Sequence, residues 1–218
     1  MGNLTLVQTI CIWALPILFA VTIHEAAHGW VANKLGDRTA WLLGRVTMNP
    51  IKHIDRVGTI LVPLLCLLFG GFVFGWAKPV PVNWYNLRHP RRDGALVAAA
   101  GPISNLIMAL LWAIVAKIGT FLVYKQGLQA GVLLTYMGFA GISINVMLMV
   151  LNFVPIPPLD GSRVVASLLP PRLALIYESI TPYGLMILLL LIFTKVLIVV
   201  IAPPYEFLLN FIINVIVR

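Results

Sequence analysis

Two histidines and a glutamate, His24, Glu25 and His28, form an H-E-x-x-H pattern near the start of the chain. On a helix, residues four apart lie on one face, so the two histidines can bind the same zinc ion. Glu25 then projects from the same turn, where its carboxylate can take a proton from a water molecule at the metal. The spacing therefore indicates metal-assisted hydrolysis. Because five-residue patterns also occur by chance, the surroundings decide how much weight this one carries.

The residues before the pattern are apolar. Residues 10–23 hold no charged side chain, and the next two residues are His24 and Glu25. Ionisable groups at membrane depth are costly, so those that are present usually serve a function. The alternatives are an incidental His-Glu-His on a surface helix and a purely structural membrane protein. The apolar surroundings argue against a surface helix, and a purely structural membrane protein leaves the cost of burying these three polar groups unexplained.

The composition is that of an integral membrane protein. The 218 residues are 61% hydrophobic and 10% charged, with a mean hydropathy of +0.99. Soluble domains carry about 25% charged residues. The net charge of +8 does not indicate nucleic-acid binding, because the basic residues cluster in short loops between apolar runs, as cytoplasmic loops do. The two cysteines provide neither a disulfide framework nor zinc-ribbon spacing.

The first apolar segment, residues 6–31, is long enough to cross a hydrocarbon core of about 30 Å. No lysine or arginine precedes Lys34, whereas residues 34–56 hold several of them. Since cytoplasmic loops are enriched in these residues, we expect the N-terminal end outside and this loop in the cytosol. Within the loop, the alternation over residues 39–48 predicts a short β-hairpin.

The next apolar stretch, residues 57–76, has basic residues on both sides. A full crossing would place one of these flanks outside, against the usual charge bias. A re-entrant segment, which enters the membrane and returns, keeps both flanks in the cytosol and is allowed where protein or water surrounds it. Pro79 and Pro81 predict that the following residues, 77–82, are extended.

Further spans are predicted at residues 96–118, 131–153 and 183–201, the last despite Lys195. Pro203 and Pro204 are expected to end that span, which leaves an apolar tail at 206–218 that is short for a crossing. The expected fold is an all-α polytopic membrane protein with about four to six transmembrane segments and a re-entrant or short β-hairpin region after the first span. We expect one membrane-embedded domain over residues 1–218, with a zinc core at about 6–165 and C-terminal helices at about 166–218.

A third zinc ligand must come from elsewhere, because catalytic zinc usually has three protein ligands and one open position. Asp160 follows a span and a proline-broken turn, which can aim a short carboxylate into a pocket. By local sequence alone, a cytosolic Asp-Gly turn is the simpler interpretation. If residues 57–76 are re-entrant, however, the span over 131–153 brings Asp160 to the inner side, where the histidines lie. The other acidic and histidine candidates are Asp37, Asp55, Asp93, Glu178, Glu206, His53 and His89.

These residues resemble the site-2 protease family of intramembrane zinc metalloproteases. The resemblance rests on HEAAH in an apolar segment together with NFVPIPPLDG at 152–161. It extends to a compact prokaryotic branch without a PDZ domain, and together the motifs cover roughly residues 20–165. Trp84 departs from that branch, where proline is more usual. The further similar segments are GDRTA at 36–40, GRVTMNPIKHID at 44–55, GWAKPVPVN at 75–83 and GPISN at 101–105.

The resemblance implies one Zn²⁺ ion held by His24, His28 and Asp160, with Glu25 as the catalytic acid and base. Asn152 and Asn105 are implied to support the substrate or the developing oxyanion, although hydrogen bonding between helices is the simpler role for both. The implied reaction is hydrolysis of a peptide bond in or near a transmembrane segment of another membrane protein. The implied location is the prokaryotic cell membrane, with the active site near the cytosolic side.

A helix hides its peptide bonds, so the substrate must unwind before attack. We expect the extended pieces at 39–48 and 77–82 to receive the unwound segment by strand addition. Two other functions remain as alternatives: a metal transporter and a non-proteolytic metal-binding scaffold. A transporter would line several spans with ligands, but the other predicted spans lack acidic and histidine residues in their cores. An inactive scaffold would usually have lost Glu25 or a ligand.

Overall fold

The computed structural model describes residues 5–68 and 75–218, and every regular element within these ranges is helical. Five segments among these described residues are long and apolar enough to cross a membrane: Val7–Leu35, Pro90–Gln126, Ala130–Phe153, Pro171–Phe193 and Val196–Val217. The expected all-α polytopic class is thereby confirmed. The elements are α1 (Leu6–Leu35), α2 (Thr39–Leu42), η1 (Pro50–His53), η2 (Arg56–Leu61), α3 (Val62–Leu68), η3 (Trp84–Asn86), α4 (Pro90–Gln126), α5 (Ala130–Phe153), α6 (Asp160–Leu168), α7 (Pro171–Glu178), η4 (Thr181–Tyr183), α8 (Gly184–Phe193), α9 (Val196–Ile212) and η5 (Ile213–Val217).

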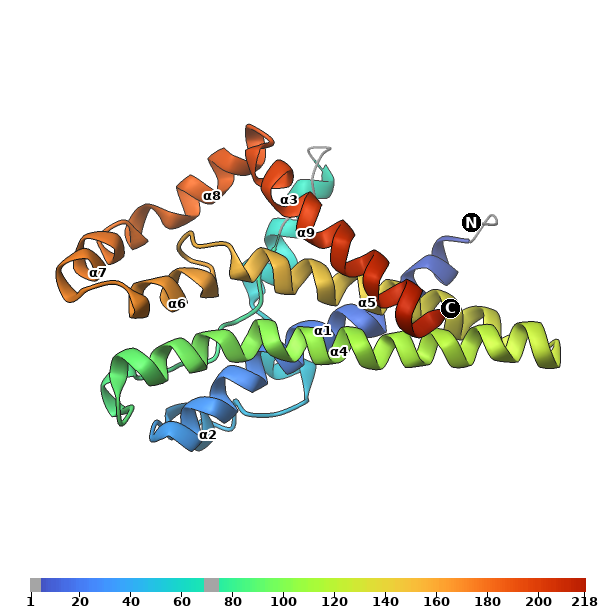
Figure 1. The fold of residues 1–218 in the computed structure, drawn as a ribbon, viewed down its shortest axis with the longest axis horizontal. Helices are drawn as coiled ribbons and strands as arrows, with labels where there is room; N and C mark the ends of the chain where they lie inside the picture. The colour runs from blue at the N-terminus through green and yellow to red at the C-terminus, as the bar shows by residue number, and fades with distance from the viewer. Residues whose placement is uncertain (1–4, 69–74) are drawn as a thin grey trace.

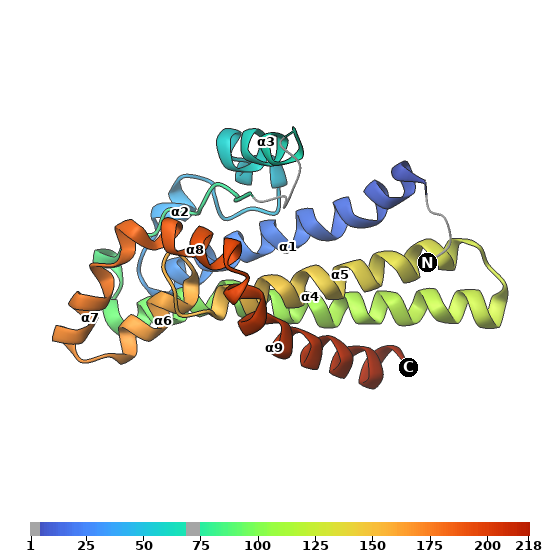
Figure 2. The same cartoon turned by 90° about the horizontal axis from the view of Figure 1, so that it is seen from above.

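The framework of the molecule is the antiparallel pair α4 and α5, with α1 packed across both (Figures 1 and 2). α4 begins with Pro90 at its first position, where proline costs no helical hydrogen bond, because the first N–H groups of a helix have no acceptor within it. The two helices approach closely because small residues face each other. A Cβ added to Gly138 would lie 2.5 Å from the backbone nitrogen of Ala116. This rigid pair carries the elements that surround the histidines.

The predicted β-hairpin at residues 39–48 is wrong. Residues Thr39–Leu42 form the short helix α2, with backbone hydrogen bonds from Leu42 N to Arg38 O (2.9 Å) and from Leu43 N to Thr39 O (3.2 Å). The part of the chain that the structure describes has no strand with which this segment could pair. Without a partner strand, the backbone satisfies its groups locally. Ala40 is fully buried, so the helical turn also packs against its surroundings.

The carboxylate of Asp37 ties the end of α1 to the segment before α4. It accepts hydrogen bonds from Thr39 N (3.0 Å), Asn83 N (2.7 Å) and Asn86 Nδ2 (3.1 Å). Burial raises the pKa of Asp37, but the hydrogen bonds from Thr39, Asn83 and Asn86 outweigh it and hold the pKa below its usual value. Arg88 N also donates to Leu35 O at 3.1 Å. The C-terminal end of α1 and the N-terminal end of α4 therefore lie together.

The predicted re-entrant segment, residues 57–76, is only partly visible. It begins as η2 and α3, and residues 69–74 lie outside the described residues. The two ends of the segment meet, because Trp76 N donates to Gly58 O at 3.1 Å and Thr59 Oγ1 donates to Trp76 O at 2.9 Å. No candidate span falls within its described part. The segment thus leaves from and returns to one place in the molecule.

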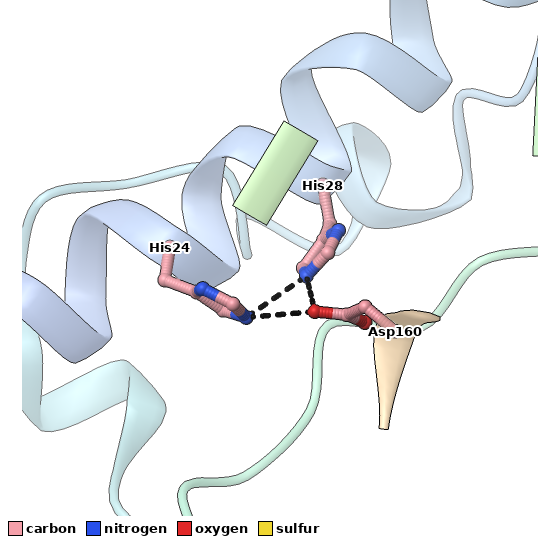
Figure 3. A group of neighbouring side chains, drawn as sticks. All are labelled: His24, His28 and Asp160. Atoms are coloured by element: carbon pink, nitrogen blue, oxygen red, sulfur yellow. Dashed lines mark hydrogen bonds and ion pairs between the residues drawn. The ribbon is translucent and has the colours of Figure 1, made fainter. Parts of the chain in front are cut away.

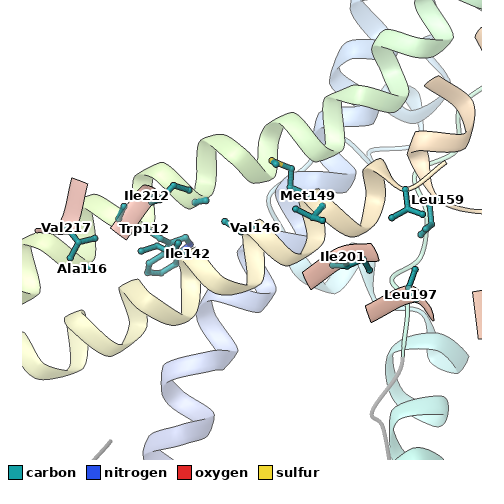
Figure 4. Packing of buried hydrophobic residues seen from close by; sticks show 14 of the residues in the cluster. Trp112, Ala116, Ile142, Val146, Met149, Leu159, Leu197, Ile201, Ile212 and Val217 are labelled. Atoms are coloured by element: carbon teal, nitrogen blue, oxygen red, sulfur yellow. The ribbon is translucent and has the colours of Figure 1, made fainter. Parts of the chain in front are cut away.

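The C-terminal helices divide at a different residue from the one predicted. The break falls at Lys195, which has a left-handed backbone (φ 61°) between α8 and α9, and Pro203 and Pro204 lie inside α9. Helices in membranes tolerate proline when neighbouring helices pack against them. Here Leu197, Ile201 and Ile212 of α9 are buried in the apolar core formed with α4 and α5 (Figure 4). Nearly all of the apolar tail at 206–218 therefore lies within the candidate span Val196–Val217.

Candidate metal centre

The C-terminal half of α1 carries the H-E-x-x-H pattern. His24 and His28 project from one face of the helix, and their Nε2 atoms lie 3.1 Å apart. The two ring planes make an angle of 84°. Both side chains are buried. The helical spacing that the sequence predicted is present, and it brings two ring nitrogens to one point.

Each histidine is oriented by a hydrogen bond at its other ring nitrogen. His28 Nδ1 lies 2.7 Å from Val97 O, which can only accept, so Nδ1 is the donor. His24 Nδ1 lies 2.6 Å from Asn105 Oδ1. The amide nitrogen of Asn105 donates to Ala20 O (3.2 Å) and Asn145 Oδ1 (2.9 Å), so its oxygen accepts from His24. In the neutral imidazoles both Nε2 atoms therefore present lone pairs, which is the arrangement of metal-binding histidines.

Asp160 lies beside the two histidines, although it is more than 130 residues further along the chain. It is the first residue of α6, after a turn in which Pro155, Pro157 and Pro158 prevent α5 from continuing. Its Oδ2 lies 3.2 Å from Nε2 of His24 and 3.4 Å from Nε2 of His28 (Figure 3). These three residues are the one such group, among the described residues, whose ligand atoms are close enough to share a metal ion.

The three converging atoms fit a zinc ion. Two imidazole lone pairs and a carboxylate repel one another unless a cation lies between them. Tetrahedral zinc with bonds of about 2.0–2.1 Å places its ligand atoms about 3.3 Å apart. The separations here are 3.1, 3.2 and 3.4 Å. Two histidines with one carboxylate are also a usual ligand set of catalytic zinc, which keeps its fourth position open.

Gly101 of α4 makes room for the two imidazole rings. A Cβ at this position would lie 2.4 Å from His28 Nε2 and 2.5 Å from His24 Cε1. Both distances are well inside van der Waals contact, and the neighbours are atoms of the proposed ligands themselves. α4 can therefore pass this close to the histidines only with glycine at position 101.

Replacement of Gly101 by alanine is expected to displace both rings and to lower zinc affinity by about 10–100-fold. The measurement is zinc retained by the purified protein against a series of competing chelators. The matched control is Gly94→Ala, about two turns earlier in α4, where the added Cβ would make an ordinary contact 3.5 Å from the Trp84 ring. If the two variants bound zinc with equal affinity, the conclusion that Gly101 makes room for the two imidazole rings would be wrong.

Glu25 is held in place by the extended segment. Its Oε2 accepts a hydrogen bond from Val80 N at 2.7 Å. Arg45 fixes this part of the segment, because its Nη2 donates to Lys78 O at 2.9 Å and to Pro79 O at 3.3 Å. Neither Val80 nor Arg45 was identified from the sequence. Their roles depend on backbone atoms and on contacts between distant segments, which a single sequence does not display.

These hydrogen bonds also bear on the expected strand addition to residues 77–82. Lys78 N donates to His53 O at 2.9 Å, Lys78 O and Pro79 O accept from Arg45, and Val80 N donates to Glu25. Pro79 and Pro81 have no N–H to offer. Lys78 N, Lys78 O, Pro79 O and Val80 N are therefore not available to a substrate strand, and strand addition to the remaining backbone groups of residues 77–82 stays a prediction.

A cavity of about 710 Å³ opens beside the three converging side chains. Its walls come from α1, the extended segment, α4, the end of α5 and α8. Glu25 and Asn152 line it, and so do Leu185 and Leu188 of α8. A second cavity of about 620 Å³ lies between α4, α6 and α7, and the two share Trp84, Pro158 and Arg163. The two cavities are thus neighbours, and both are lined mostly by apolar surface.

The two asparagines predicted from the sequence occupy different positions. Asn152 lines the cavity, and its Nδ2 donates to Leu148 O at 2.9 Å. Asn105 is fully buried behind His24, away from the cavity wall. Sequence reasoning missed Asn145, which is also fully buried and accepts from Asn105. Its place in an apolar span, seven residues before Asn152 and so on the same helical face, was the available signal.

Comparison with known proteins gives a consistent result. Residues 12–125 match the model of peptidase family M50, a range that contains both histidines and Glu25 but ends before Asp160. The chain is 40% identical over 187 residues to a Bacillus subtilis protein named "Putative zinc metalloprotease YwhC", covering 83% of this chain and 79% of that protein. It is 28% identical over 181 residues to "Putative zinc metalloprotease Rip2" of Mycolicibacterium smegmatis, covering 83% and 66%. No solved structure gives a significant match.

Proposed function

Because this chain belongs to peptidase family M50 and is a membrane-embedded zinc metalloprotease, we propose that it hydrolyses a peptide bond in or near a transmembrane segment of another membrane protein. The observation that supports this most directly is the position of the candidate metal centre. His24 and His28 lie inside the candidate span Val7–Leu35, and Asp160 joins them there. A protease whose reacting groups are at membrane depth acts on segments that lie in the membrane.

In this proposal His24, His28 and Asp160 hold one Zn²⁺ ion. The support is the convergence of their ligand atoms and the hydrogen bonds that turn both Nε2 lone pairs toward that point. Asn105 acts through His24: its oxygen fixes the imidazole, and Asn145 and Ala20 fix the amide in turn. This makes Asn105 a positioning residue rather than a group that touches the substrate.

Zinc, when bound, supplies a Lewis acid that polarises the scissile carbonyl and makes water acidic enough to react near neutral pH. Glu25 takes a proton from the attacking water and later delivers it to the leaving amine. The Val80 N–H holds Oε2 of Glu25 and so leaves the other oxygen to handle the proton. Asn152, with its amide at the cavity wall, binds substrate backbone or the developing oxyanion.

We place the unwound part of the substrate in the groove that runs past Glu25. In this proposal the groove comprises the cavity at the metal centre and the neighbouring cavity between α4, α6 and α7, which share Trp84, Pro158 and Arg163 as lining residues. At the junction, the guanidinium of Arg163 lies over the Trp84 ring, 4.2 Å from its centroid. Such a pair presents both an apolar face and hydrogen-bond donors to a peptide.

The active site is proposed to lie toward the cytosolic side, with residues 57–76 re-entrant. The basic loop after α1 follows the histidines directly, as expected of a cytosolic loop. The hydrogen bond from Arg88 N to Leu35 O joins the ends of α1 and α4, so the chain between them makes no net crossing. The meeting of Gly58 and Trp76 supports the same path. α5 then returns Asp160 to the side of the histidines.

The alternative functions, metal transport and a non-proteolytic scaffold, account for less of the arrangement. A transport path needs successive ligand groups, but the described residues hold one group that could bind a metal. A scaffold needs no carboxylate beside the metal, yet Glu25 is present and held by Val80. A protease uses both the single metal-binding group and the Glu25 carboxylate.

The test is cleavage by the purified enzyme in liposomes, with single-span membrane proteins of varied sequence as substrates. We expect cuts within or next to the span, located by the masses of both products. Removal of zinc with 1,10-phenanthroline should abolish cleavage, and added zinc should restore it. Cleavage that survives metal removal, or that occurs only in unstructured soluble peptides, would contradict the proposal.

A further inference from the structure

Helix α9 and the turn that follows it carry a polar stripe on their outer face. The candidate span Val196–Val217 has one charged residue, Glu206, at the eleventh of its 22 positions. Asn210 and Asn214 follow at intervals of four, so the three side chains lie along one side of the helix. All three are exposed on the surface of the molecule. This stripe, Glu206, Asn210 and Asn214, faces away from the core.

Backbone acceptors extend the stripe toward the start of α9. Pro203 and Pro204 have no N–H, so the helical hydrogen bonds to the carbonyl oxygens of Val199 and Val200 cannot form. Val199 is 70% exposed and Val200 is 54% exposed. Val199 and Pro203 precede Glu206 by seven and three residues and so lie on the same side of the helix. The outer face of α9 is therefore rich in hydrogen-bond acceptors.

The rotation of α9 is set by its inner face. Tyr205 places its hydroxyl 2.7 Å from Ser143 Oγ of α5, and Ile201 and Ile212 are buried against the core (Figure 4). Glu206 follows Tyr205 by one residue, so it cannot turn inward without breaking these contacts. Within the described residues, Glu206 makes no ion pair, and the side chains of Asn210 and Asn214 make no hydrogen bond.

An unpaired carboxylate near the middle of a span is costly, and so are unpaired amides and carbonyls in hydrocarbon. Polar groups at such positions are satisfied by another helix or by water. We propose that this stripe binds a transmembrane helix of a partner membrane protein that carries a lysine or arginine at the depth of Glu206. A cation pairs with the carboxylate, and its N–H groups match the acceptors beside it.

A second copy of the chain fits this surface less well. In a two-fold pair about the membrane normal, equal residues stand at equal depth, so Glu206 would face Glu206. The two lysines nearest along the span lie at other depths. Lys195 precedes Glu206 by eleven residues, about 16 Å of helix. Lys117 Nζ bonds to Ile216 O, ten residues beyond Glu206, or about 15 Å.

The partner is also distinct from the segment that is cleaved. None of Glu206, Asn210 and Asn214 lines the cavity at the metal centre, whose walls come from other elements. A helix on the outer face of α9 would dock beside the enzyme and leave the groove open to substrate. The stripe thus defines an intramembrane binding surface that is separate from catalysis.

The test measures energy transfer in liposomes between the labelled full-length chain and a synthetic helix of about 20 leucines with one central lysine. An all-leucine helix is the probe control. We expect the wild type to bind the lysine helix and Glu206→Leu to bind it at least about tenfold more weakly. Phe207→Leu, the exposed neighbour on the same helix, should change binding by less than about twofold. Glu206→Leu should still cleave membrane substrates, which shows that it folds.

Two results would overturn the inference. One is that the wild type does not bind the lysine helix, or that Glu206→Leu binds it as tightly as the wild type does. The other is concentration-dependent energy transfer between two labelled copies of the chain that Glu206→Leu abolishes, because it would assign the stripe to self-association. Failure of the cleavage assay in the wild type, by contrast, would count against the proposed protease function and not against this surface.

Discussion

Replacement of Glu25 by glutamine is expected to lower peptide-bond hydrolysis by about 10²–10⁴-fold while zinc stays bound. Glutamine keeps an oxygen that can accept the Val80 N–H, so the fold around the site should be maintained. It cannot take a proton from water, so the step that Glu25 performs is lost. The measurement is the rate of product formation from a single-span substrate in liposomes, with zinc per protein determined by elemental analysis.

Glu25→Asp is the informative companion variant. It retains a carboxylate but withdraws it by one methylene, so its activity should fall between those of the wild type and Glu25→Gln. Loss of zinc in Glu25→Gln would show that the glutamate maintains the metal site rather than handling the proton. Hydrolysis by Glu25→Gln at more than about a tenth of the wild-type rate would rule out Glu25 as the general base.

Replacement of Asp160 by alanine is expected to remove zinc and activity together. The ligand set would fall from three protein atoms to two, and the remaining Nε2 atoms of His24 and His28 would lack the carboxylate that balances the charge of the ion. We expect zinc affinity to fall by at least about 100-fold, more than in Gly101→Ala, where all three ligands remain. Zinc retained against competing chelators measures this directly.

Asp160→Asn and Glu178→Ala control this experiment. Asparagine keeps an oxygen without the charge, so it should bind zinc with intermediate affinity. Glu178 lies on α7 and lines the second cavity, between α4, α6 and α7, but not the cavity at the metal centre. It is not part of the group at the metal centre, so its replacement should leave zinc bound. Full zinc content in Asp160→Ala would show that the third ligand is a different residue, and it would also weaken the topology proposed for residues 57–76.

Helix α4 has a larger role in the site than its sequence suggested. It supplies the carbonyl of Val97 and the amide of Asn105 that orient the two histidines, and Gly101 between them makes room for the rings. The three positions follow one another by four residues, which places them on one face toward α1. The candidate metal centre would therefore be built on α1 and α4 and completed by the carboxylate of Asp160 at the start of α6.

Several features were determined by the sequence alone because they depend on local chemistry. The composition and the long apolar runs determined the membrane class, since hydrocarbon excludes charge over the length of a span. The spacing of His24 and His28 determined that both lie on one helical face, where they can form a candidate metal site, since four residues make about one helical turn. Asp160 could be proposed from topology, because the basic loops restrict which ends of the spans lie on the same side.

Other features were decided only by the tertiary structure. Residues 39–48 alternate like a strand, but Thr39–Leu42 form the short helix α2, because the described residues include no strand that could complete their hydrogen bonds. The last span breaks at Lys195 rather than at Pro203, because burial of Ile201 and Ile212 holds α9 together across its prolines. Asn145, Gly101 and Val80 acquire their roles through contacts with residues 40 to 77 positions away. Such contacts arise from packing between distant segments, and a single sequence carries no periodic signal for them.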